Sequence, residues 1–192
     1  MIENVHRPKT RRRLTALLGL AAFALVGAGA LASEPDAPGS AERFHHLSAH
    51  GNSNCSADFL ASIPKMSAME RLQGSCCSPM EQARYAEQVQ GLKDFSADAE
   101  IPPDPYDIPA GLAQKALQYY DLALTPDEQK AYDYAMANSA EEGPCCCKCW
   151  RWKVYGGLGK YLIRTRHYTG QQLTDLWNVG QGCGGPTDTM MH

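Results

Sequence analysis

The chain has 192 residues, eight of them cysteine, and a formal net charge of −3 at pH 7. Its first 32 residues contain five of the 18 Lys and Arg residues but only one of the 21 Asp and Glu residues. The rest of the chain is therefore acidic, with 13 basic against 20 acidic side chains, which argues against nucleic acid as a partner. Its length predicts one domain.

Residues 1–32 have the pattern of a secretory signal peptide. Basic residues precede an uncharged apolar run of 19 residues, 14–32, which ends in the small-x-small cleavage signature Ala30-Leu31-Ala32. We therefore expect export to the periplasm or the extracellular space, after cleavage before Ser33. An uncleaved run would instead anchor the protein in a membrane, since it is just long enough to span one. The segment 10–14 also resembles a twin-arginine export signal.

Residues 33–54 are rich in Ser, Ala, Gly, Pro and Asn and show no apolar period. This composition predicts a flexible leader. It carries His45, His46 and His50, which are either surface side chains or auxiliary metal ligands.

Residues 55–192 predict a single, mainly helical domain with irregular cysteine-rich loops. Apolar residues three and four positions apart predict a helix over residues 57–72, in which Pro64 marks a kink or a late start. Another helical stretch is predicted over residues 80–92. The proline-punctuated segment 94–109 is expected to be a non-helical connector.

The second half of the domain contains clearer helix signals. An apolar stripe predicts a helix over residues 110–124, and Thr125 with Glu128 forms a capping box that predicts the next helix over residues 126–138. Residues 160–164 are expected to form a short helix or strand. A second capping box at Thr169 predicts a last helix, which Gly180 should end.

Four of the eight cysteines lie within residues 145–149. Pro144 favours an extended or looped backbone there, and side chains two positions apart in an extended segment point to the same side. Cys145, Cys147 and Cys149 are therefore predicted to form a thiolate metal site, with Cys146 turned away.

The remaining cysteines are candidates for further ligands or for disulfides. Adjacent cysteines rarely pair with each other, so Cys76 and Cys77 are expected to reach the later cluster, as does Cys183. Cys146 and Cys55 are the candidate disulfide cysteines. Residues 148–174 contain six Lys and Arg residues and no acid; this is either a solvated basic face or a charge that lowers the pKa of nearby thiols.

A site made only of sulfur selects a soft or borderline ion, which here means Cu(I), Zn(II) or Hg(II). Zinc ribbons use two Cys-x-x-Cys pairs well apart in the sequence, an arrangement that this chain lacks. The crowded cysteines, together with nearby Met and His residues, favour Cu(I) as the bound metal ion.

The segment Pro144-Cys145-Cys146-Cys147-Lys148-Cys149 resembles the motif Pro-Cys-Tyr-Cys-Gly-Cys, which names a family of exported bacterial proteins. The upstream residues 132–135, Tyr-Asp-Tyr-Ala, also look like that family's pattern, and the resemblance covers about residues 120–150. It implies that Cys145, Cys147 and Cys149 correspond to the three cysteines of the motif. Family members are mostly lipoproteins, whereas this chain lacks a lipid-bearing cysteine at the cleavage point.

These observations predict an exported, non-enzymatic protein that sequesters a soft metal ion or transfers it to another metal carrier or a membrane metal transporter. One alternative is a structural or interaction domain stabilised by disulfides, in which all eight cysteines are paired. A further alternative is a thiol-disulfide oxidoreductase, although no βαβ pattern accompanies the cysteines.

Overall fold

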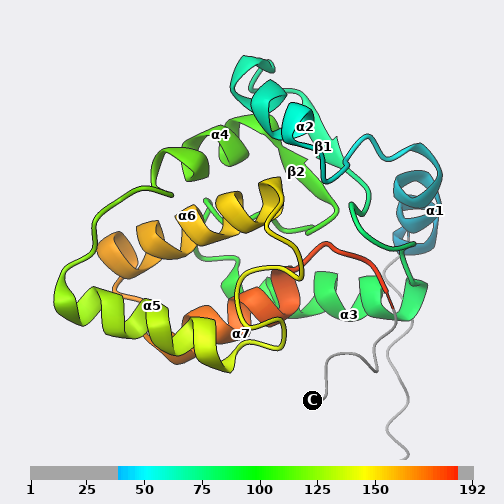
Figure 1. The fold of residues 1–192 in the computed structure, drawn as a ribbon. Helices are drawn as coiled ribbons and strands as arrows, with labels where there is room; N and C mark the ends of the chain where they lie inside the picture. The colour runs from blue at the N-terminus through cyan, green and yellow to red at the C-terminus, as the bar shows by residue number, and fades with distance from the viewer. Residues whose placement is uncertain (1–38, 186–192) are drawn as a thin grey trace, which may run out of the picture. The chain divides into compact units, whose positions relative to one another are not determined.

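A computed structural model describes residues 39–185, which belong to one compact unit of the chain, Pro35–His192 (Figure 1). The predicted signal peptide, residues 1–32, and residues 33–38 of the predicted leader lie outside the described residues. Within residues 39–185, every helix is too short or too polar to cross a membrane.

The described chain is mainly helical, as the sequence predicts. Short 3-10 helices and one two-stranded sheet complete the fold. In chain order the elements are α1 (Ser40–His50), α2 (Ala57–Ser62), η1 (Ile63–Lys65), β1 (Arg71–Gln73), α3 (Gln82–Gly91), η2 (Leu92–Phe95), β2 (Asp107–Pro109), α4 (Ala110–Gln118), α5 (Pro126–Asn138), α6 (Trp150–Arg166) and α7 (Gly170–Gly180).

Both predicted capping boxes are present. The Thr125 side chain accepts a hydrogen bond from the backbone N–H of Glu128, and the Glu128 carboxylate accepts one from the backbone N–H of Thr125. Thr169 and Gln172 form the same pair at the start of α7. These bonds satisfy N–H groups that the first turn of a helix leaves unpaired, so α5 and α7 begin where the sequence predicts.

Helix α6 is the central element of the larger core (Figure 1). It packs against α4 on one side and against α5 and α7 on the other, with Trp150 and Leu162 fully buried. The sequence predicts only a short element over residues 160–164, because three glycines weaken the helix signal upstream. Gly157 has a packing role: a Cβ atom there would collide with the carbonyl oxygen of Ala116 in α4.

The helix predicted over residues 57–72 is wrong beyond Lys65. Helix α2 ends at Ser62, one short 3-10 turn follows at Pro64, and the chain then forms β1. Proline lacks the N–H group that an α-helix would need at this position. Strand β1 pairs antiparallel with β2, and the paired residues Leu72 and Ile108 are both fully buried.

Residues 40–50 also differ from the predicted flexible leader, since they form α1. Leu47 is buried in a second small core with Tyr85 and Tyr106. Arg43 pairs with Asp104 at 2.8 Å and also with Asp107. These distant contacts order a segment whose own sequence shows no amphipathic period.

Candidate metal site

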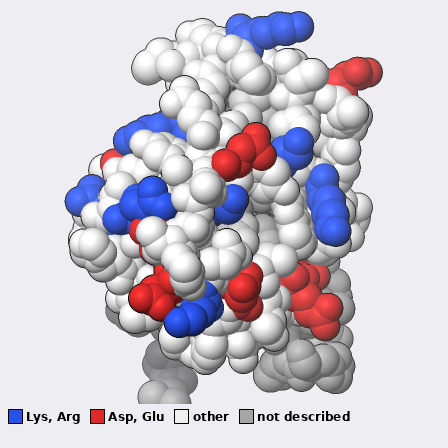
Figure 2. All heavy atoms as spheres, turned by 60° about the vertical axis from the view of Figure 1, so that its left-hand side comes forward, with Lys and Arg blue, Asp and Glu red and all other residues white. Residues whose placement is uncertain are grey.

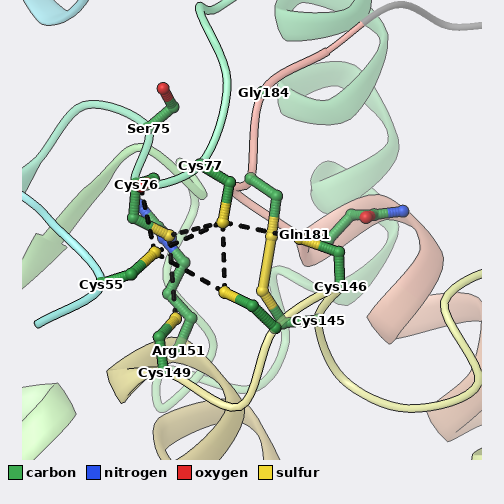
Figure 3. The surroundings of a disulfide bond; sticks show 12 residues. Cys55, Ser75, Cys76, Cys77, Cys145, Cys146, Cys149, Arg151, Gln181 and Gly184 are labelled. Atoms are coloured by element: carbon green, nitrogen blue, oxygen red, sulfur yellow. Dashed lines mark hydrogen bonds between the residues drawn. A yellow bond between two sulfur atoms is a disulfide. The ribbon is translucent and has the colours of Figure 1, made fainter.

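Six cysteines with free thiols gather where three loops of the domain meet (Figure 3). Cys55 lies directly before α2, and Cys76 and Cys77 lie in the turn after β1. The other three, Cys146, Cys147 and Cys149, lie in the loop between α5 and α6. The fold therefore joins thiols that are far apart in the sequence.

Cys77 has the most sulfur neighbours in the group. Its Sγ atom lies 3.1 Å from that of Cys147 and 3.3 Å from that of Cys55. The sulfurs of Cys146 and Cys76 lie 3.6 Å and 3.7 Å away. Cys77 is solvent-exposed, so the centre of the group is accessible from outside.

Four of these cysteines, Cys55, Cys76, Cys77 and Cys147, form a compact tetrad in which all sulfurs lie within 4.8 Å of one another. A tetrahedral metal ion with metal–sulfur bonds of about 2.3 Å separates its sulfur ligands by about 3.8 Å. The tetrad has this size, with observed separations such as 3.6 Å between Cys55 and Cys147. The clustered cysteines could therefore hold a metal ion, and all the ligand atoms would be sulfur.

Cys149 is a buried cysteine at the N-terminus of α6, with its sulfur 3.7 Å from that of Cys76. The hydrogen bond from Cys76 lowers the pKa of the Cys149 thiol to about 5 against the opposing effect of burial. The backbone N–H groups of Arg151 and Trp152 act in the same direction, although the sulfur makes no regular N-cap hydrogen bond. This environment favours the thiolate form of Cys149.

Cys77 is the second cysteine whose pKa is lowered. Burial raises its pKa, but hydrogen bonds from Cys147, Cys55 and other neighbouring thiols outweigh that effect. Burial is also the main cause of the raised pKa values of Cys55 and Cys147. The thiolate form is therefore favoured at Cys77 and Cys149, whereas the protonated thiol is favoured at Cys55 and Cys147.

Arg151 connects α6 to the turn that carries Cys76 and Cys77. Its guanidinium is fully buried, lies 4.5 Å from the centre of the Trp150 ring, and donates hydrogen bonds to the carbonyl oxygens of Gly74, at 2.8 Å, and Pro105. Its positive charge also lowers the pKa of Cys76, although the hydrogen bond to Cys149 and burial leave that pKa raised. Arg151 therefore both positions the thiols and offsets their charge.

Asn52 and Ser53 hold the segment of Cys55 beside the same turn. The Asn52 side chain accepts a hydrogen bond from the backbone N–H of Gln73 at 2.8 Å and donates one to the carbonyl of Arg71 at 2.9 Å. The backbone N–H of Ser53 donates to the carbonyl of Gln73, also at 2.9 Å. The chain before α2 thus runs along β1, which brings Cys55 to the cysteines that follow β1.

Cys145 and Cys183, which the sequence predicts as metal ligands, form a disulfide. Each also belongs to a group of three cysteines whose sulfurs lie within 4.8 Å of one another, Cys145 with Cys146 and Cys147, and Cys183 with Cys77 and Cys146. Both are buried, and their disulfide joins the loop between α5 and α6 to the chain that follows α7 (Figure 3). The carbonyl of Cys183 accepts a hydrogen bond from the backbone N–H of Ser78 at 2.9 Å. Gly184 follows with a φ of 75°, and a Cβ atom at this position would collide with the carbonyl oxygen of Ser78.

The prediction that Cys146 turns away from Cys145 and Cys147 is wrong, because the sulfurs of these three residues lie within 4.8 Å of one another, while that of Cys146 also contacts the sulfur of Cys77. Residues 142–149 form successive bends rather than an extended segment, and the backbone N–H of Cys149 donates to the carbonyl of Cys147 at 2.8 Å. Side chains two positions apart therefore do not share one side. Cys146 and Cys149 have Cys-x-x-Cys spacing, yet Cys146 contacts Cys77 while Cys149 contacts Cys76.

Cys55 and Cys146 are both free, although the sequence marks them as disulfide candidates. Cys55 belongs to the tetrad. The sequence around Cys55 does not indicate this role, because the other three cysteines approach it only in the folded chain. His46 and His50 lie together on α1 with ring centres 5.3 Å apart. Among the described residues, the groups able to hold a metal ion contain cysteine only.

The basic stretch of residues 148–174 does not form a uniformly basic face. Arg166 pairs with Asp98 at 3.0 Å and with Glu100 at 3.3 Å, and Arg164 pairs with Glu128. Side chains of both charges lie next to one another on the face that Figure 2 shows. Within this stretch, Arg151 carries a positive charge that lowers the pKa of the Cys76 thiol.

No protein-family model, curated protein or solved structure is significantly similar to this chain.

Proposed function

We propose that this chain is an exported protein that binds a soft metal ion, Cu(I) in the first place, through Cys55, Cys76, Cys77 and Cys147. The observation that carries the proposal is the convergence of these four sulfurs from three loops, all within 4.8 Å of one another. Zn(II) and Hg(II) are the other ions that suit such ligands.

Two features favour Cu(I) over Zn(II). A closed zinc site uses four ligands, whereas six free thiols meet here. The site is also open on one side, since Cys55, Cys77 and Cys146 are exposed. Exposed thiolates allow a partner's thiols to attack the bound ion and take it over, which suits a protein that sequesters a metal ion and passes it to a carrier or a membrane transporter.

The proposed export has two supports. Residues 1–32 have the signal-peptide pattern, and the Cys145–Cys183 disulfide is typical of proteins in oxidising compartments. The resemblance of residues 144–149 to an exported family's motif agrees with this location.

A competition titration tests the proposal. The full chain is reduced under anaerobic conditions and titrated with Cu(I) against a chromophoric Cu(I) chelator, with parallel titrations of Zn(II) and Hg(II). We expect stoichiometric Cu(I) uptake that is lost in the quadruple variant with serine at all four tetrad positions. The matched control replaces Cys145 and Cys183 by serine and should keep its Cu(I). Absence of uptake by the wild-type chain would refute the proposal.

A second candidate function, a disulfide-stabilised structural domain, is favoured by one observation. The six free sulfurs can be paired completely at short range, as Cys76 with Cys149 at 3.7 Å, Cys77 with Cys146 at 3.6 Å and Cys55 with Cys147 at 3.6 Å. Counting free thiols in denatured, unreduced protein separates the two candidates. Six free thiols support the metal site, and none supports the structural domain.

A further inference from the structure

We infer that the six thiols hold at least two Cu(I) ions in one cluster, with Cys77 as a thiolate that bridges ions. This inference rests on the proposed function and specifies its stoichiometry. It follows from which sulfur atoms lie close to one another.

The contacts of Cys77 exceed those of a ligand in a single four-sulfur site. In such a site each sulfur has three sulfur neighbours, whereas Cys77 has four within 3.7 Å. One of these, Cys146, lies outside the tetrad. An ion bound by the tetrad would leave the Cys77–Cys146 contact unused.

The six sulfurs also extend beyond the tetrad on the side of Cys76. Cys149 lies 3.7 Å from Cys76, and Cys76 lies 3.7 Å from Cys77. The sulfurs of Cys146, Cys77, Cys76 and Cys149 thus form a continuous row, with Cys55 and Cys147 beside Cys77. Among the described residues, no group whose sulfurs all lie within 4.8 Å of one another contains both Cys146 and Cys149. One ion would therefore not bind both ends of this row, whereas two ions that share the central sulfurs would reach all six.

Charge balance points the same way. A Cu(I) ion on four thiolates has a net charge of −3, and the buried guanidinium of Arg151, whose charge acts on Cys76, offsets one unit of it. Uncompensated charge at partly buried positions is costly. A thiolate sulfur has enough lone pairs to bind two ions, so a further Cu(I) held by thiolates that are already deprotonated adds a positive charge, whereas a Cu(I) that replaces one thiol proton leaves the net charge unchanged. The step is an exchange of Cu(I) for H⁺, which is released to solvent, and involves no oxidation.

Native mass spectrometry of the full chain during anaerobic Cu(I) addition counts the ions directly. We expect species with two or more Cu(I) per chain to form together, with little one-ion species, and the luminescence typical of solvent-shielded Cu(I)–thiolate clusters. Cys146→Ser and Cys149→Ser should each lower the maximum number of ions. The Cys145→Ser/Cys183→Ser variant should keep the wild-type number.

A wild-type chain that saturates at one Cu(I), with the same number in Cys146→Ser and Cys149→Ser, would overturn the cluster and leave the proposed function intact. A chain that binds no Cu(I) would overturn both. Circular dichroism of every variant separates the loss of ligands from the loss of fold.

Discussion

The Sγ atoms of Cys77 and Cys147 lie 3.1 Å apart, although 70 residues separate them in the chain. One belongs to the turn after β1 and the other to the loop before α6. Tertiary packing therefore sets this contact, and the site should be lost when the domain unfolds.

Replacing Cys77 should weaken Cu(I) binding more than replacing any other cysteine. Cys77→Ser removes the sulfur with four sulfur neighbours. Mutations of groups that only support a metal ligand cost about 10–100-fold in affinity, so we expect a loss of at least about 100-fold. Competition with a Cu(I) chelator measures it. Equal losses for Cys77→Ser and Cys146→Ser would contradict the central position of Cys77.

The disulfide should contribute to stability and not to metal binding. Cys145 and Cys183 close a loop with a sequence separation of 38. Replacing both by alanine should lower the free energy of unfolding by about 2–4 kcal/mol, mainly because the unfolded chain gains freedom. Denaturant unfolding gives this value, and metal analysis gives the stoichiometry. A folded double variant that no longer binds Cu(I) would restore these cysteines as ligands.

Arg151→Met should lower both stability and metal affinity. Methionine keeps the bulk of the side chain but removes the hydrogen bonds to the carbonyls of Gly74 and Pro105, which should cost about 2–4 kcal/mol. It also removes the positive charge near Cys76. Lys153→Met, two positions further along α6, is the control and should change stability by less than about 1 kcal/mol. Equal effects of the two variants would refute this role of Arg151.

The ion-pair network at Glu100 should make stability depend on pH. Burial raises the pKa of Glu100, but hydrogen bonds from Lys115, Tyr161 and Arg166 outweigh it and lower the pKa to about 2. A carboxylate with a lowered pKa stabilises the fold above its ordinary pKa, and this contribution disappears as the pH falls toward 2. Glu100→Gln should therefore lower the melting temperature at pH 7, with a difference that shrinks between pH 4.5 and 2. A difference that stays constant over this range would contradict the assignment.

The sequence predicts the fold best where helix signals are local. The capping boxes at Thr125 and Thr169 involve residues three positions apart, and both helices begin as predicted. Helix α6 is different, because its glycines lower helix propensity while their small size lets α4 approach. Helix α1 likewise depends on distant partners of Arg43 and Leu47. Such contacts are not visible in a local sequence pattern.

The cysteine site was predictable as a site but not in its membership. Four cysteines in five positions mark the loop before α6. The loop bends, however, so side chains two positions apart do not point to the same side as they would in an extended segment. The pairing of Cys145 with Cys183 and the inclusion of Cys55 depend on how the chain after α7 and the segment before α2 are placed. Only the folded chain contains that information.

Alkylation of the folded, full-length chain with and without Cu(I), followed by mass spectrometry of the peptides, tests the central claim most directly. We expect Cys55, Cys76, Cys77 and Cys147 to react without the ion and to be protected with it, while Cys145 and Cys183 are recovered as a disulfide in both samples. Equal modification of the four tetrad cysteines in both samples, or their recovery as disulfides, would contradict it.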